Sequence, residues 1–308
     1  MWVPFNLNDF LITFLSIILE GLPFLLVGSI LSVILDVTIP DSWINRISPK
    51  NVVAGALVGG TLGLIFPVCE CGMIPIIRRL LKRGMPLPLV MAYMLSSPIM
   101  NGVSAVSTYI AFQGQSPFEM TALRLIGGYS IAVLVSLLIS RIPLPQLLKP
   151  GVTSPSLFEG GFRNITTQSS QKPKLSWPKI ANSATKDFLD ITFYFICGTM
   201  LAAAFSTMVN RPALAEMTSN PLIAIQIMML AAALLSVCST SDAFIAAALI
   251  GVPLSAKLAF LIFGPMFDLK LMFLYSSVFY KKAIAQMTIA IAFLTVIFCL
   301  CAHYFRWI

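Results

Sequence analysis

The sequence predicts an all-α integral membrane protein that consists of two inverted repeats, and three observations lead to this fold class. Only 10% of the 308 residues are charged and 58% are hydrophobic, whereas soluble domains carry about 25% charged residues. Apolar runs long enough to cross a bilayer recur along the chain. Two distant stretches also carry glycine, proline and cysteine in one register. The net charge of +8 gathers at the ends of apolar runs, which follows the positive-inside rule and does not indicate nucleic-acid binding.

The first half of the chain, residues 1–141, contains four apolar segments. They run over residues 10–35, 52–66, 87–112 and 120–140. A break in the apolar pattern, Pro67 to Gly72, follows the second segment, and a short apolar piece then leads to a basic cluster at 78–83. The third segment is interrupted at Ser96–Pro98. We therefore expect three transmembrane helices plus a broken or re-entrant helical hairpin.

The second half, residues 187–308, repeats this plan. Its apolar segments run over residues 188–209, 222–237, 243–250, 256–279 and 283–305. The apolar pattern breaks at Cys238 to Asp242 and again at Gly264–Pro265. Between the halves, residues 142–186 are rich in Ser, Pro and basic side chains, which predicts a flexible cytoplasmic linker.

An internal duplication connects the two halves. Residues 84–101 align without a gap with residues 251–268, with identical residues at five positions, and the same register pairs Cys71 with Cys238. The basic cluster at 78–83 is expected on the cytoplasmic side, as the linker is, whereas its uncharged counterpart at 245–254 is expected outside. The charge pattern therefore predicts that the repeats are inverted and that the N-terminus lies outside.

The symmetric breaks indicate transport. Irregular backbone at membrane depth is tolerated where it is buried in protein or lines a wet cavity. Paired interruptions in an inverted repeat are typical of a midplane substrate site in a secondary transporter. We expect Ser97 and Ser241 to cap short helices that begin at the breaks. Gly55, Gly59 and Gly63 are expected to let two helices pack closely.

Three cysteines at the breaks are the candidates to bind a solute. Thiolates are soft ligands that prefer soft metals and metalloids, so Cys69, Cys71 and Cys238 would hold a thiophilic solute. Further contacts are expected from polar residues at or near the breaks: Glu70, Ser97, Asn101, Ser239, Ser241, Asp242 and Asp268.

Acidic residues in or beside the apolar runs are candidates to carry a coupling proton. Ionisable groups in a membrane are costly and are functional candidates by default. Burial favours the neutral form of a carboxylate, which suits this role for Glu20, Glu70 or Asp242. Asp268 and Lys270 are two positions apart, so we expect them to point to different sides of a helix rather than to pair.

The run from Phe66 to Pro75, which contains Cys-Glu-Cys-Gly, resembles a family of predicted permeases that includes the ArsP-type organoarsenical efflux permeases and the YraQ-like proteins. The runs from Cys238 to Ala247 and from Gly264 to Lys270 are similar to the same family. The resemblance implies an integral permease of the bacterial inner membrane. It also implies export of trivalent methylated or aromatic arsenicals, and hence arsenic resistance, with cysteines that recognise the solute.

The leading hypothesis is thus a secondary transporter that exports a thiophilic solute, and other readings stay open. The first alternative is transport of another small solute, an inorganic anion or a metal ion, with structural cysteines. A membrane redox enzyme is disfavoured because one residue separates Cys69 from Cys71, whereas redox motifs use two; a non-transporting scaffold is a further reading. We expect no enzymatic activity, cofactor or resident metal. The expected partners are a small-molecule or metalloid substrate and the lipid bilayer, with a homo-oligomer left open.

Overall fold

The computed structural model describes residues 7–38, 51–66, 68–149, 177–208, 220–249 and 251–305. Within these ranges the protein is α-helical, apart from one isolated antiparallel bridge between Leu148 and Phe279. Most of the expected linker lies outside the described residues. The described part confirms the predicted all-α class.

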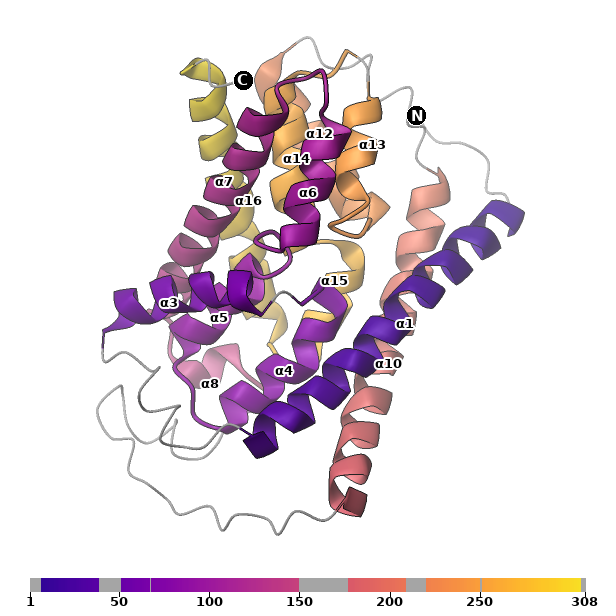
Figure 1. The fold of residues 1–308 in the computed structure, drawn as a ribbon, viewed down its shortest axis with the longest axis vertical. Helices are drawn as coiled ribbons and strands as arrows, with labels where there is room; N and C mark the ends of the chain where they lie inside the picture. The colour runs from indigo at the N-terminus through magenta and orange to yellow at the C-terminus, as the bar shows by residue number, and fades with distance from the viewer. Residues whose placement is uncertain are drawn as a thin grey trace.

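Within the described ranges, six helices of the first half precede six helices of the second (Figure 1). The first six are α1 (Leu7–Thr38), α3 (Val52–Ile65), α4 (Glu70–Lys82), α5 (Leu87–Ser96), α6 (Gly102–Ala111) and α7 (Pro117–Ile139). The second six are α10 (Trp177–Met208), α12 (Pro221–Leu235), α13 (Asp242–Ala248), α14 (Leu254–Met266), α15 (Leu269–Ser276) and α16 (Lys281–Tyr304). A short helix, α8 (Leu144–Leu147), lies between the two sets.

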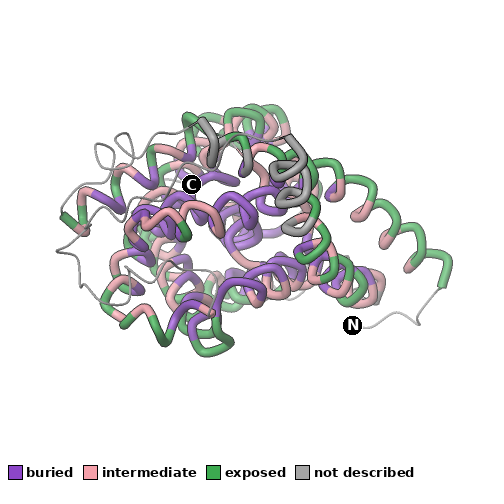
Figure 2. Tube along the Cα trace, turned by 90° about the horizontal axis from the view of Figure 1, so that it is seen from below, coloured by how far each residue is buried: buried purple, intermediate pink, exposed green. Residues whose placement is uncertain are grey.

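Five described stretches are long and apolar enough to cross a membrane. They are Leu7–Ser32, Pro117–Ile139, Phe188–Thr207, Leu254–Ser276 and Lys281–Tyr304. Their outward faces are apolar, as lipid requires: on α1, for example, Ile12, Leu15 and Leu19 are exposed. Figure 2 shows the buried positions on the central helices and the exposed ones along the outer helices. This distribution supports membrane integration.

Matching positions in the two halves adopt the same local conformation. Gly84 and Gly251 both have a positive φ, 81° and 85°, in the turn before α5 and before α14. This left-handed region is open to glycine because it lacks a Cβ. Asn101 and its counterpart Asp268 are both N-caps, at α6 and α15, and each side chain accepts a backbone N–H of the helix that it caps. The duplication is therefore visible in helix order and in turn geometry.

Equivalent helices of the two halves take complementary partners. Helix α4 packs against α15, whereas its counterpart α13 packs against α6, and α7 packs against α16. In Figure 1, α4 lies toward the lower end of the molecule and α13 toward the upper end. This pairing is compatible with inverted halves; the inversion itself stays a prediction.

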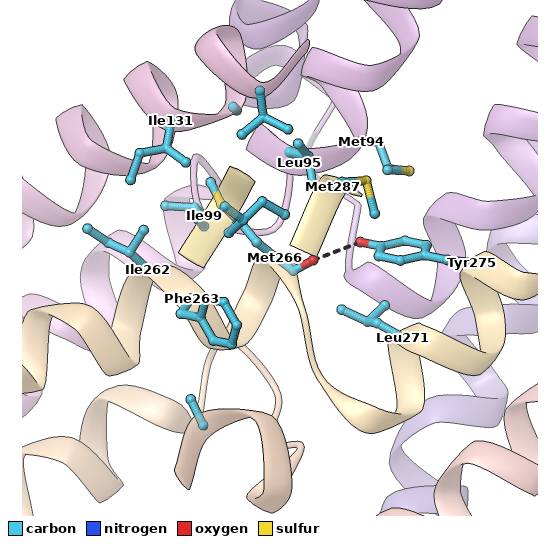
Figure 3. Packing of buried hydrophobic residues seen from close by; sticks show 14 of the residues in the cluster. Met94, Leu95, Ile99, Ile131, Ile262, Phe263, Met266, Leu271, Tyr275 and Met287 are labelled. Carbon is cyan, nitrogen blue, oxygen red and sulfur yellow. Dashed lines mark hydrogen bonds between the residues drawn. The ribbon is translucent and has the colours of Figure 1, made fainter. Parts of the chain in front are cut away.

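The core lies around α5 and α14, which are buried along their whole length except at the start of α14. A helix that is apolar on every side requires neighbours on every side. Figure 3 shows Leu95, Ile262 and Met266 among the packed side chains, with the Tyr275 hydroxyl donating a hydrogen bond to the backbone oxygen of Met266 at 3.0 Å. The central pair thus provides a rigid base for the breaks that flank it.

The predicted close packing of α3 is confirmed at Gly59 and Gly63 but not at Gly55, whose nearest atom would lie 4.0 Å from a Cβ. A Cβ placed on Gly59 would lie 2.1 Å from the backbone oxygen of Leu89 in α5. Gly63 is in similar contact with Ser96 and Ser97. A second close crossing joins α1 to α4, where a Cβ on Gly28 would lie 2.4 Å from the backbone oxygen of Gly72. The first contacts hold α3 against α5, and the last holds the first turn of α4 against α1.

Two predicted details are wrong. Ser97 does not begin a helix: it follows the end of α5, and Asn101 caps the next helix. The Ser97 hydroxyl instead binds the backbone of the first break, accepting from the N–H of Val68 at 3.1 Å and donating to backbone oxygens there. The second-half helix also continues through Gly264–Pro265, where an interruption was expected, and ends at Met266. Surrounding helices stabilise such a proline in a membrane helix.

Candidate functional site

A cavity of about 250 Å³ lies where the two halves meet. Its walls come from α1, α10, the first turn of α4, the chain between α12 and α13, and α15. Lining residues from the first half are Thr13, Ser16, Ile17, Glu20, Gly21, Phe24, Cys69, Glu70 and Cys71. Those from the second half are Phe195, Ser206, Leu235, Ser236, Val237, Cys238, Ser241 and Lys270. Both predicted cysteine-bearing breaks therefore open onto one cavity.

The breaks place the three thiols at the cavity wall. Cys69 is the extended N-cap residue of α4, and Cys71 lies in the first turn of that helix. Cys238 lies in the turn that precedes α13, and its backbone oxygen accepts the N–H of Ser241 and of Asp242. All three cysteines are free thiols; Cys71 is buried and the other two are half-buried. Among the described residues, no three His, Cys, Asp or Glu side chains form a group that could hold a metal ion.

A buried charge cluster lies beside the thiols. The Lys270 ammonium is 3.6 Å from the Glu70 carboxylate and 3.7 Å from the Asp268 carboxylate. All three residues are at most 3% exposed. Ser239 donates to the second Glu70 oxygen at 3.4 Å. Because Glu70 belongs to α4 and Lys270 to α15, this cluster joins the two halves across the cavity wall.

The expectation that Asp268 and Lys270 do not pair is therefore wrong. The i, i+2 argument applies to two residues inside one helix. Asp268 is the N-cap of α15, outside the regular helix, and its other carboxylate oxygen accepts the N–H of Leu271 at 2.6 Å. The extended backbone at the cap turns the carboxylate toward the first turn, where Lys270 lies.

A second buried ion pair also spans the two halves. Arg124 in α7 has no exposed surface and donates to Asp242 in α13 at 2.7 Å. The same guanidinium donates to the backbone oxygen of Ser239 at 3.0 Å and to the hydroxyl of Thr108 at 2.7 Å. Ser104 donates to that Ser239 oxygen as well, at 3.0 Å. Arg124 thus provides a hydrogen-bond donor to the irregular backbone of the second break.

The structure brings part of the predicted site together. The predicted residues that line the cavity are Glu20, Cys69, Glu70, Cys71, Cys238 and Ser241. Ser239, Asp242 and Asp268 lie directly behind them in the two charge clusters. Ser97 and Asn101 do not line the cavity: one binds backbone at the first break and the other caps α6. Ser241 occupies the N-cap position of α13 but makes no side-chain capping bond.

Sequence reasoning missed Arg124 and the role of Lys270. A single arginine inside the apolar run 120–140 was the available signal, because a charge at membrane depth requires a partner. Its partner is 118 residues away along the chain, and no local pattern identifies it.

Comparison with known proteins places the chain among permeases. Residues 6–304 match the family ArsP_1, described as a predicted permease. A protein of Streptococcus mutans, described as a subunit of a two-component membrane permease complex, is 33% identical over 302 residues, which cover 97% of this chain and 96% of that protein. The UPF0718 protein YcgR of Bacillus subtilis is 36% identical over 273 residues, covering 87% and 88% of the two chains. No solved structure matches.

The helical architecture, the apolar outer surface and the extent of these matches agree with one another. The chain therefore belongs to the ArsP_1 family of predicted permeases.

Proposed function

We propose that this permease exports a small thiophilic solute, such as a trivalent organoarsenical, through the cavity between its halves. The observation that carries the proposal is the position of three free thiols, Cys69, Cys71 and Cys238, on the wall of one cavity. They come from both halves of the chain. A solute that binds thiols of both halves contacts both of the parts that would move. Its binding would therefore depend on the relative position of the halves, as alternating access requires.

The chemistry of trivalent arsenic suits such a site. A soft centre of this kind prefers sulfur ligands to oxygen ligands. When a thiol binds methylarsenite, an As–S bond replaces an As–OH bond, and the thiol hydrogen leaves with the hydroxyl group as water. The reverse reaction, with water as the attacking group, releases the solute unchanged. No oxidant or reductant is needed, so the exchange is compatible with transport.

The charges around the cavity favour a neutral or cationic solute over an anion. Two carboxylates, Glu20 and Glu70, line the cavity together with one ammonium, Lys270. A third carboxylate, Asp268, already neutralises part of the charge on Lys270. An inorganic anion would therefore meet unfavourable charge in a poorly solvated site. This argument supports the thiophilic solute over the anion alternative.

Alternating access would move one half against the other around the cavity. The contacts of α4 with α15, α6 with α13, α7 with α16 and α1 with α10 join the halves and would change in this movement. The proposed setting is a bacterial inner membrane, with the N-terminus outside and the linker in the cytoplasm. A homo-oligomer remains a candidate assembly, and the description of the Streptococcus mutans relative makes a second subunit another.

Uptake by everted membrane vesicles tests the proposal. Vesicles that contain the wild type should accumulate trivalent methylarsenite, and Cys69→Ser, Cys71→Ser and Cys238→Ser should each reduce uptake. Cys299→Ser is the matched control, because Cys299 is a fully buried thiol in α16 that does not line the cavity. Uptake that is equal in all five proteins would reject the role of the thiols. Uptake of arsenate or phosphate instead of methylarsenite would favour the anion alternative.

A further inference from the structure

We propose that Glu70, Lys270 and Asp268 form a binding site for one exchangeable proton, and that Glu70 is the residue that carries it. The inference rests on the proposed function, because it assigns the ion that would drive solute export. It starts from the geometry of the cluster: the ammonium of Lys270 lies 3.6 Å from Glu70 and 3.7 Å from Asp268, and all three side chains are buried.

The cluster contains more negative groups than positive groups. Two carboxylates and one ammonium leave one negative charge when all three groups are ionised. An unbalanced charge at membrane depth is costly. The other buried ion pair, Arg124 with Asp242, is already balanced and cannot compensate for it. Addition of one proton makes the cluster neutral, so burial favours the binding of one proton by these three side chains.

Glu70 and Asp268 differ in how firmly they are held. Both acids lie at a helix N-terminus, where negative charge is favoured, and one oxygen of Asp268 also accepts the N–H of Leu271 at 2.6 Å. Glu70 receives only long contacts, 3.4 Å from Ser239 and 3.6 Å from Lys270. Glu70 also lines the cavity, whereas Asp268 does not. The proton therefore exchanges at Glu70, and Asp268 stays ionised as the partner of Lys270.

A second observation points to a missing proton or hydrogen-bond donor. The remaining carboxylate oxygen of Asp268 is buried and makes no hydrogen bond. Buried acceptors without a donor are rare and costly. When Glu70 is protonated, the Lys270 ammonium no longer divides its charge between two carboxylates and can approach Asp268 to hydrogen-bond distance. Protonation of Glu70 would thus satisfy the Asp268 oxygen that has no hydrogen bond in this structure.

The other ionisable groups near Glu70 do not replace it. These groups are Glu20 on α1, Cys69 and Cys71 beside it in the chain, Cys238 on the second break, and the pair Arg124 and Asp242 behind Ser239. Glu20 is exposed on α1 and has no cation within ion-pair distance among the described residues. Asp242 is fixed by Arg124 at 2.7 Å. Of the three acids considered from the sequence, Glu70 alone combines a cavity position with a loosely held cation.

Protonation of Glu70 would couple to movement because its partner belongs to the other half. A hydronium ion in the cavity transfers its proton to the Glu70 carboxylate, which forms one O–H bond and leaves a water molecule. The attraction between Glu70 on α4 and Lys270 on α15 is then lost. The contact between α4 and α15 weakens, and the halves can part at that end. A solute bound at Cys69 and Cys71, on either side of Glu70, would compete with this change.

Reconstituted protein in liposomes tests the inference with two assays on the same vesicles. In the first, an imposed pH gradient drives accumulation of methylarsenite. In the second, counterflow at equal pH, labelled methylarsenite exchanges with unlabelled methylarsenite across the membrane. Glu70→Gln, which fixes the neutral form, should lose accumulation driven by the gradient, and whatever counterflow it shows should no longer change with pH, whereas wild-type counterflow should. Glu119→Gln is the matched control, because Glu119 is exposed at the start of α7, away from the cavity.

Each outcome decides a separate point. Accumulation by Glu70→Gln at the wild-type level, or wild-type counterflow with no response to the gradient, would overturn the proton site and leave the solute site intact. Loss of both activities in Glu70→Gln would assign Glu70 to the solute site instead. A wild type without counterflow would reject the proposed function itself.

A direct measurement covers the case in which Glu70→Gln does not fold. Methylarsenite added to purified wild-type protein in weakly buffered solution should release protons into the medium, because two ligands that compete are linked reciprocally. The Glu119→Gln protein should release as many protons as the wild type does. Absence of proton release from a wild type that binds methylarsenite would overturn the inference.

Discussion

Replacement of Arg124 by Met tests whether the buried pair with Asp242 holds the two halves together. The guanidinium has no exposed surface, and it lies 2.7 Å from a carboxylate that is itself 2% exposed. Removing one partner of a buried ion pair leaves an uncompensated charge, at a cost of about 3–5 kcal/mol. In a chain of this size each kcal/mol lowers the melting temperature by about 2 °C. We therefore expect Arg124→Met to melt about 6–10 °C below the wild type.

The double variant Arg124→Met/Asp242→Asn separates the charge from the other contacts of the arginine. It removes the uncompensated carboxylate, so the loss should fall from about 3–5 kcal/mol to about 2 kcal/mol. The remaining deficit reflects the hydrogen bonds to Thr108 and to the backbone of Ser239, about 1 kcal/mol each.

Thermal unfolding of purified protein in detergent, followed by tryptophan fluorescence, provides the measurement. Arg141→Met is the matched control, because Arg141 is an exposed arginine just after α7. A melting temperature for Arg124→Met equal to that of Arg141→Met would refute the reasoning. So would a double variant that is less stable than the single one.

Three further predictions use the same melting assay. Gly59→Ala should destabilise by about 1–3 kcal/mol, because its Cβ would lie 2.1 Å from a backbone oxygen of α5; Gly55→Ala, with its nearest atom at 4.0 Å, should not, and equal effects would contradict the packing. Asn101→Ala should cost about 1 kcal/mol as a lost N-cap, and Asn101→Asp should restore it. Gln115→Ala should destabilise more than Lys257→Met, since it removes the acceptor at 2.9 Å and leaves a buried ammonium with only the longer contact to the Ala247 oxygen at 3.5 Å; the reverse order would be contrary to this account.

The sequence predicts the backbone plan well because glycine and proline act locally. A positive φ at Gly84 and Gly251 and a cap at Asn101 and Asp268 depend on a few neighbouring residues, so a gap-free alignment transfers them between the halves. Pro265 is the exception, because the helix that continues through it depends on packing against distant helices and not on neighbouring residues. A proline that a soluble helix would reject is retained because packed neighbours support the helix around it.

Partners of the buried charges could not be predicted, because they depend on how distant helices cross. Arg124 meets Asp242 only after α7 and α13 are placed on either side of α6. Asp268 pairs with Lys270 because it lies at a cap and not inside a helix. The thiols were expected at a cavity, since breaks at membrane depth require a cavity or buried surroundings, and they line one; their role as ligands stays a prediction.

The central claim is that thiols of both halves bind the solute in the cavity. X-ray absorption at the arsenic edge, measured on purified protein incubated with trivalent methylarsenite, tests it most directly. We predict sulfur neighbours around arsenic in the wild type and in Cys299→Ser, with fewer sulfur neighbours in Cys69→Ser, Cys71→Ser or Cys238→Ser. A spectrum of the bound wild type with only oxygen and carbon neighbours would contradict the account.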